Sequence, residues 1–206
     1  MSGFLRIVMI GAMLALAACA STTFESTWKA PDAQQVNPVG QTIAAVFVSP
    51  DESKRRAGED ALAADLTQRG AHGIPGYTVL PAGQPGTGEA ARDHLKAVGA
   101  TGVVVMRVVG KDQQVSYTPG YVSTMPAYYG GFGPYWSYGW QTVYEPGYLQ
   151  TDTVVSVETL IYSLKQDKLL WAATSRTTNP ANLDNLVKEV ADAVAKEMKK
   201  QGLLAP

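Results

Sequence analysis

An almost unbroken run of β-branched residues at positions 102–110 (GVVVMRVVG) constrains the fold of this chain most strongly. The run lacks the alternation of a half-buried strand and is typical of a central strand covered on both faces. We expect the strand to continue toward Tyr117. Such a strand needs neighbouring strands at its edges and helices over its faces.

The segment before this run begins with a strand and a helix. Residues 42–48 (TIAAVFV) predict a short buried strand that ends at Ser49-Pro50. A helix follows, with Asp51 or Ser53 as its N-cap and Gly70 after its last turn. Its expected apolar stripe consists of Ala57, Ala61, Leu62 and Leu66.

A second strand and a second helix are expected next. Residues 76–82 (GYTVLPA) predict the strand, and residues 89–98 predict the helix, with Gly99 at its end. Alternation of strands and helices favours parallel pairing in this first half of the sheet.

The second half of the chain predicts a hairpin and a terminal helix. Residues 151–164 and 169–178 form two strands joined by the polar turn 165–168, which favours antiparallel pairing. Residues 182–201 predict a strongly amphipathic helix. Its apolar face consists of Leu183, Leu186, Val187, Val190, Val194 and Met198. The sequence therefore predicts an α/β fold, a two-layer sandwich with a mixed sheet of about five strands, two early helices and a C-terminal amphipathic helix.

The N-terminus has the layout of a secretory signal: Arg6, an apolar core at residues 7–16, and small residues before the single cysteine, Cys19. The sequence Leu-Ala-Ala-Cys at 16–19 resembles the bacterial lipobox. We therefore expect residues 1–18 to be a lipoprotein signal peptide and Cys19 to be lipidated. Several acyl chains on one residue give stable membrane anchoring. Residues 19–41 would form the lipidated cysteine and a flexible tether, and residues 42–206 a single domain.

The residues after Cys19 bear on location. In Gram-negative lipoproteins an aspartate directly after the cysteine marks retention at the inner membrane, and here Ala20 and Ser21 follow. The resemblance therefore implies the periplasmic face of the outer membrane. Without Arg6 the formal charge changes from −1 to −2. A chain with no basic excess is not expected to bind nucleic acid.

Residues 42–81 and 156–180, together with the terminal helix, resemble small, functionally uncharacterised bacterial envelope lipoproteins. The order of elements is similar to that of the periplasmic lipoprotein domains related to the N-terminal domain of TolB, to LpoB and to CsgG. The resemblance implies a fold and a location. It includes no catalytic motif, and a fold alone transfers no activity.

No residue pattern predicts catalysis or a cofactor. Residues 86–91 (GTGEAA) match a dinucleotide fingerprint formally, but the residues before them read as a loop without the required tight strand-to-helix turn. His72 and His94 are the only histidines, and Cys19 is committed to lipid, so we expect no metal site. Arg107 lies inside the apolar run and needs a partner if buried, for which Glu158 is one candidate. We expect a protein that is not an enzyme.

Residues 117–148 contain eleven of the eighteen aromatic residues and only one charge, Glu145. Glycine and proline predict a long loop at 118–148. Three interpretations remain open: a structural lid or insertion, a surface that binds an envelope protein, and a platform for sugars or a lipid interface. A lipoprotein that binds or acts on peptidoglycan or another glycan is therefore the alternative to a non-catalytic binding or assembly module. The candidate contact residues are Tyr128, Tyr129, Phe132, Tyr135, Trp136, Tyr138, Trp140 and Tyr144.

Overall fold

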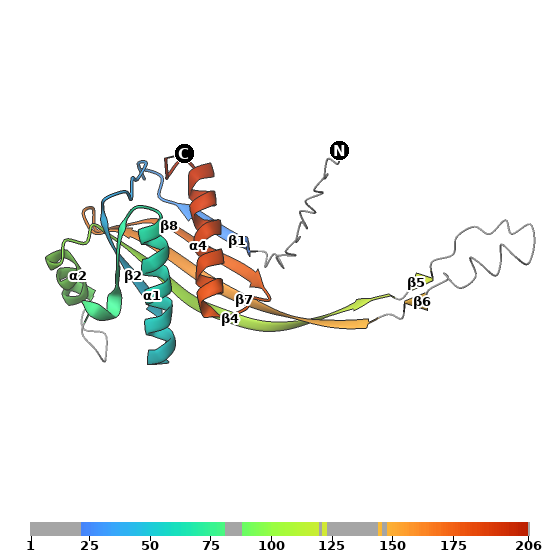
Figure 1. The fold of residues 1–206 in the computed structure, drawn as a ribbon. Helices are drawn as coiled ribbons and strands as arrows, with labels where there is room; N and C mark the ends of the chain where they lie inside the picture. The colour runs from blue at the N-terminus through green and yellow to red at the C-terminus, as the bar shows by residue number, and fades with distance from the viewer. Residues whose placement is uncertain (1–21, 81–87, 120, 123–143, 146–147, 206) are drawn as a thin grey trace, which may run out of the picture.

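A six-stranded mixed sheet forms the centre of the computed structural model, which describes residues 22–80, 88–119, 121–122, 144–145 and 148–205 (Figure 1). The strand order is β1-β8-β7-β4-β2-β3. The strands are β1 (Thr22–Lys29), β2 (Thr42–Val48), β3 (His72–Pro75), β4 (Gly102–Thr118), β7 (Tyr148–Ser163) and β8 (Lys168–Thr178). The helices are α1 (Glu52–Gln68), α2 (Gly88–Ala97), α4 (Leu183–Lys200) and the short 3-10 helix η1 (Gly76–Thr78).

The predicted α/β class and mixed sheet are confirmed. β2 pairs in parallel with both β3 and β4, whereas β7 pairs antiparallel with β4 and β8. The parallel pairs lie in the part of the sheet whose strands alternate with helices, as expected for crossover connections. The sheet has one strand more than expected because the segment before β2 contributes β1.

Helices α1 and α4 lie side by side on one face of the sheet (Figure 1). Alternate residues of β4, Val104 and Met106, join this main core, and both are at least nine-tenths buried. The predicted apolar face of the terminal helix is confirmed, since Leu186, Val187, Val190, Val194 and Met198 are all buried.

A second, smaller core lies on the opposite face of the sheet. Val103, which alternates with Val104 along β4, packs there with Ala44 of β2 and Leu95 of α2. Because successive strand residues point to opposite faces, α2 covers one end of the face that α1 and α4 leave free. The remainder of that face is not covered by a helix among the described residues.

Both long helices begin at a capping side chain, and for α1 it is one of the two predicted candidates. The Asp51 carboxylate accepts hydrogen bonds from the backbone N–H groups of Ser53 and Lys54, so Asp51 is the N-cap of α1. Asn182 caps α4 in the same way. The stripe on α1 differs from the prediction, because Ala57 is exposed while Glu59 is buried.

The prediction of a flexible tether is wrong for residues 22–41. Thr22–Lys29 forms β1, which pairs antiparallel with β8 at the edge of the sheet. Ala30 is fully buried, and its N–H donates to the carbonyl oxygen of Leu170. Val36 forms a parallel bridge with Leu204 near the other end of the chain. The folded domain therefore begins at or before Thr22.

The predicted strand at 76–82 is also wrong. The strand in this region is β3, four residues earlier, and Gly76–Thr78 forms η1. β3 passes so close to α1 that a Cβ on Gly73 would lie 2.2 Å from the Ala63 carbonyl oxygen. Glycine at position 73 thus permits the sheet edge and the helix to meet.

β4 and β7 extend well beyond their neighbours as a two-stranded ribbon (Figure 1). Their pairing continues to Thr118 and Tyr148, so the predicted continuation of β4 toward Tyr117 is confirmed. A short pair, β5 (Tyr121–Val122) with β6 (Tyr144–Glu145), follows within the predicted loop 118–148. None of the helices in the described part of the chain is long and apolar enough to cross a membrane.

Candidate functional site

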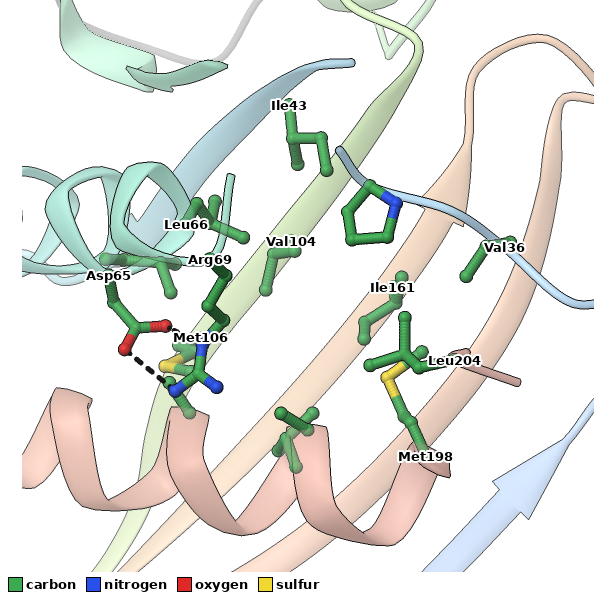
Figure 2. A pocket seen from close by; sticks show the side chains of 15 residues that line it. Val36, Ile43, Asp65, Leu66, Arg69, Val104, Met106, Ile161, Met198 and Leu204 are labelled. Atoms are coloured by element: carbon green, nitrogen blue, oxygen red, sulfur yellow. Dashed lines mark hydrogen bonds and ion pairs between the residues drawn. The ribbon is translucent and has the colours of Figure 1, made fainter. Parts of the chain in front are cut away.

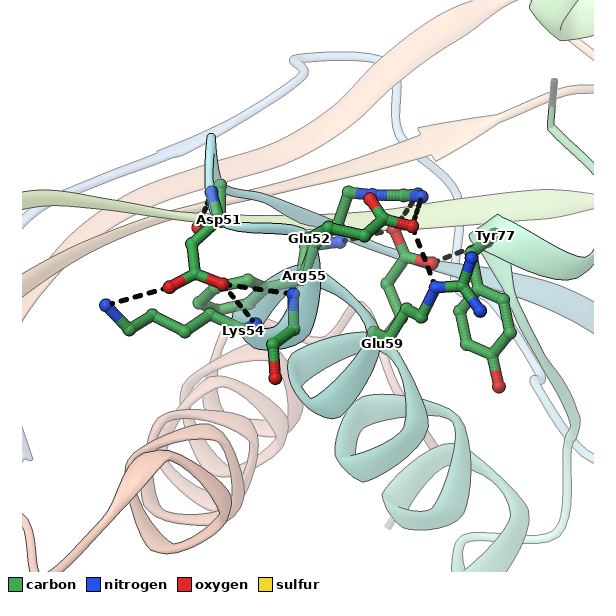
Figure 3. A network of polar contacts seen from close by, with 10 residues as sticks. Asp51, Glu52, Lys54, Arg55, Glu59 and Tyr77 are labelled. Atoms are coloured by element: carbon green, nitrogen blue, oxygen red, sulfur yellow. Dashed lines mark hydrogen bonds and ion pairs between the residues drawn. The ribbon is translucent and has the colours of Figure 1, made fainter. Parts of the chain in front are cut away.

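A polar network surrounds the start of α1 (Figure 3). Glu52 accepts hydrogen bonds from Arg55 and Arg56, which lower the pKa of its carboxyl group to about 2. The Arg56 guanidinium carbon lies 5.0 Å from the centre of the Tyr77 ring. A helix N-terminus after a parallel strand is a common anion site. Here Asp51 caps the helix and Glu52 occupies both arginines, so the network is suited to holding the fold together.

Glu59 is the buried carboxylate of this network, with only 1% of its surface exposed. It accepts hydrogen bonds from the backbone N–H of Tyr77 at 2.5 Å and of Phe47 at 3.4 Å. Arg55 lies 3.4 Å away as its ion-pair partner. Burial raises the pKa of Glu59 above its ordinary value, and these donors oppose the shift without cancelling it. Glu59 thereby joins α1 to the end of β2 and to η1.

Glu59→Gln should change how stability depends on pH. Because the folded state holds the Glu59 proton to higher pH than the unfolded state does, this group contributes a stability that falls as pH rises above 4.5. Glutamine does not titrate. The free energy of unfolding of the variant, relative to wild type, should therefore rise as the pH increases above 4.5 in urea titrations.

Asp51→Asn is the matched control for this measurement. Hydrogen bonds from the backbone N–H and side chain of Lys54 lower the pKa of Asp51 below 3.8. The stabilisation by the Asp51 carboxylate is therefore lost only as the pH falls into the acidic range. The difference in unfolding free energy between Asp51→Asn and wild type should stay flat over the pH range in which that of Glu59→Gln rises. If the difference in unfolding free energy between Glu59→Gln and wild type stayed flat or fell with rising pH, burial would not raise the pKa of Glu59.

A cavity of about 110 Å³ lies between the sheet and the two long helices (Figure 2). Val104, Met106, Ile161 and Met198 are among its apolar lining residues. The charged residues in its wall, Asp65 and Arg69, pair with each other through hydrogen bonds of 2.6 and 2.9 Å. With its charged groups paired, the lining of this cavity is apolar and presents no catalytic arrangement.

The sheet face opposite α1 and α4 is the more promising surface. Cross-strand pairing aligns Trp28 of β1 with Ala172, Ala172 with Leu160, and Leu160 with Val105. Paired residues share a face, so these four form an apolar row across the sheet. The next row consists of Ser26, Thr174, Glu158 and Arg107. These eight residues, an apolar row beside a polar row, are called the Trp28 face below.

Trp28 borders a groove on this face. Its side chain is 47% exposed and lines a groove of about 250 Å³ together with Glu158, Leu160 and Thr174. Arg107 donates to Glu158 at 2.8 Å, which confirms the partner expected for this arginine. Arg107 is itself 52% exposed, so the pair lies at the surface. A half-exposed tryptophan beside an accessible arginine is typical of protein contact surfaces.

The residues predicted from sequence as contact sites are not brought together in the described structure. Cys19 lies outside the described residues, as do Tyr128, Tyr129, Phe132, Tyr135, Trp136, Tyr138 and Trp140. Tyr144 belongs to β6 and pairs with Val122. His72 and His94 are exposed on β3 and α2 respectively. The anchoring and contact roles of Cys19 and the aromatic residues stay predictions.

The Trp28 face was missed because its residues come from four strands. Trp28 lies in a segment that the sequence predicts to be a flexible tether, and Arg107 lies inside the apolar run at 102–110. Only the strand order, with β1 beside β8, places both on one surface. No local sequence pattern predicts that neighbourhood.

No family model and no curated protein matches the sequence. Among solved structures, the chain is similar to the PelC dodecamer from Paraburkholderia phytofirmans, with 13% identity and a TM-score of 0.43, over 82% of this chain and 90% of that chain. It is also similar to lipoprotein GNA1162 from Neisseria meningitidis, with 15% identity and a TM-score of 0.42, over 78% of this chain and 99% of that chain. The expected resemblance to bacterial envelope lipoproteins, including those related to TolB, LpoB and CsgG, stays a prediction. At these identities, function must be argued from this chain's own residues.

Proposed function

We propose that this chain is an envelope lipoprotein, held at the periplasmic face of the outer membrane by lipid on Cys19, that binds another envelope protein without catalysis. The Trp28 face is the observation that carries the proposal. It is an accessible sheet surface with a half-exposed tryptophan at its edge and an arginine–glutamate pair within it.

The chemistry of the Trp28 face suits a protein partner. Tryptophan and arginine are the residue types that most often dominate binding energy at protein interfaces. The apolar row supplies area that a partner can remove from water, and the polar row beside it supplies hydrogen-bonding groups for orientation. The charged groups of the α1 network are paired with one another, which favours a binding role over a catalytic one.

A photo-crosslinking residue at Thr174, in the groove beside Trp28, tests the proposal in intact cells. We expect one specific crosslinked envelope protein, and Trp28→Ala should weaken its binding by at least about tenfold. The same crosslinker at Lys199, an exposed position on α4, is the control. Equal products at both positions, or no change with Trp28→Ala, would argue against the proposal.

Glycan binding is the second candidate, favoured by the same groove. An aromatic ring beside the hydroxyl of Thr174 and the carboxylate of Glu158 can stack on a sugar and hydrogen-bond its hydroxyl groups. Sedimentation with purified peptidoglycan distinguishes the two candidates. If wild type sediments and Trp28→Ala does not, while Thr174 yields no protein crosslink, glycan binding replaces protein binding as the function.

A further inference from the structure

The distal part of the β4–β7 ribbon has a surface that the proposed function does not use. β2 accompanies β4 only to Arg107, and β8 accompanies β7 only to Val154. Beyond these points β4 and β7 pair only with each other, and the ribbon leaves the body of the sheet (Figure 1). An isolated two-stranded ribbon is marginally stable in water. A ribbon of this length therefore gains from a surface that covers it.

The distal ribbon, residues 115–118 and 148–151, carries no charged side chain. Val115, Tyr117, Tyr148 and Leu149 are 64%, 65%, 58% and 70% exposed. Tyr117 pairs with Leu149 and shares its face with Val115, whereas Tyr148 lies on the other face. The charged residues of the ribbon, Lys111, Asp112 and Asp152, all lie nearer the sheet. Within the β4–β7 pairing, charge is thus absent from the last residues, Val115–Thr118 and Tyr148–Thr151, where the exposed apolar side chains lie.

The strand register places the N-terminal end of β1 at the base of this ribbon. Thr22 pairs with Thr177, Thr177 with Val155, and Val155 with Lys111, so one row crosses the sheet from the start of β1 to the point where the ribbon begins. β1 runs from this row toward the other end of the sheet. Cys19, which precedes Thr22 by three residues, is therefore joined to the domain on the side toward which the ribbon extends.

Covalent lengths then relate the ribbon to the anchor. Three residues of fully extended chain, from Cys19 to Thr22, reach at most about 11 Å. The seven steps from Lys111 to Thr118 rise about 23 Å along the ribbon. Because the ribbon outreaches the link and starts from the same row, an anchor at Cys19 brings the distal ribbon to the membrane surface. Tyrosine is favoured at that interface, where its ring is apolar and its hydroxyl is hydrated.

We infer that the distal ribbon lies in the headgroup interface of the membrane that holds Cys19, as a second, non-covalent contact with lipid. The inference rests on the proposed anchoring at Cys19. The ribbon contact fixes the orientation of the domain, with the row of Thr22 and Lys111 toward the bilayer. The end of the sheet from which the ribbon extends then points toward the membrane. The Trp28 face lies on the side of the domain, open to a neighbouring protein in the periplasm.

Fluorescence quenching in vesicles tests the inference on the full lipidated protein. The thiol of a lipidated Cys19 is blocked, so a cysteine introduced by Leu149→Cys is the only site for an environment-sensitive dye. The labelled protein is reconstituted into vesicles of phosphatidylethanolamine and phosphatidylglycerol that contain headgroup spin-labelled lipid. We expect a blue shift and strong quenching at position 149. Ser116→Cys, on the opposite face of the ribbon, is the second reporter.

Gln166→Cys is the matched control, because Gln166 is an exposed residue in the turn between β7 and β8, at the other end of β7. Its dye should show neither a shift nor quenching. Tyr117→Lys combined with Leu149→Lys should reduce quenching of the Ser116→Cys reporter while the protein stays in the vesicle fraction.

The outcomes separate this inference from the proposed anchoring. Equal signals at positions 149, 116 and 166 on a protein with lipidated Cys19 overturn the ribbon contact and leave the anchor intact. Shielding of position 149 only after addition of a purified envelope protein overturns the lipid contact in favour of a protein one. An unmodified Cys19 overturns both proposals, because the direction of the ribbon relative to the membrane then has no basis.

Discussion

Val190→Asp is expected to remove several kcal/mol of folding stability and to lower the melting temperature strongly. Val190 is fully buried between α4 and the sheet, in the main core. A carboxylate placed there loses its hydration without gaining a partner, which costs several kcal/mol. Domains of this kind are stable by only about 5–15 kcal/mol. The substitution therefore removes much or all of the stability, and thermal melting followed by circular dichroism should show it.

Lys196→Asp provides the control for this result. Lys196 is exposed on the same helix, so the variant introduces the same side chain without burying it. Its melting temperature should stay close to that of wild type. If Val190→Asp melted like wild type, α4 would not belong to the folded core, and its amphipathic face would need another explanation.

Trp171→Ala is expected to cost about 3–5 kcal/mol of unfolding free energy. The Trp171 side chain is fully buried, and its ring meets that of Phe24 edge-on, with 6.0 Å between centroids. Its indole N–H donates to the Gln201 side chain at 3.0 Å. Trp171 of β8 thus contacts both β1 and the residue that ends α4. Urea unfolding measures the loss.

Trp171→Phe separates packing from hydrogen bonding at this position. Phenylalanine keeps an aromatic contact with Phe24 and loses the N–H donor, so its cost should be clearly smaller than that of alanine. Phe24→Ala should also destabilise the protein, because Phe24 packs against the main core. A neutral Phe24→Ala would contradict the assignment of β1 to the folded domain.

Strong periodic patterns predicted most of the fold. The β-branched run at 102–110, the hairpin strands and the terminal helix were all predicted at nearly the observed bounds. Each of these elements has a long apolar pattern, and Asp51 gives the start of α1 a cap with a clear local signature. The central strands and the terminal helix can therefore be predicted from the sequence.

Edge elements were missed for physical reasons. In β1 the register shifts between Phe24 and Ser26, so Phe24 faces the helices while Trp28 faces the opposite side. A bulge of this kind removes the alternation that identifies a strand. β3 is only four residues long, and its place depends on the close approach of Gly73 to α1. Contacts between distant segments decide both elements.

The candidate site depends on the same long-range information. The Arg107–Glu158 pair was predicted because two adjacent strands could be inferred from the sequence. The groove beside Trp28 was not predicted, because it forms only when β1 lies at the edge of the sheet. The start of β7, residues 148–150, was not predicted as strand, since glycine, proline and aromatic residues nearby obscure its alternation.

Mass spectrometry of the mature N-terminus tests the anchoring, on which both proposals depend, most directly. The protein is purified from membranes with detergent, and its N-terminal peptide is sequenced. The account predicts that the chain begins at Cys19 and carries a diacylglyceryl group on the sulfur of that residue. A mature chain that begins elsewhere, or that carries a free thiol at Cys19, would contradict it.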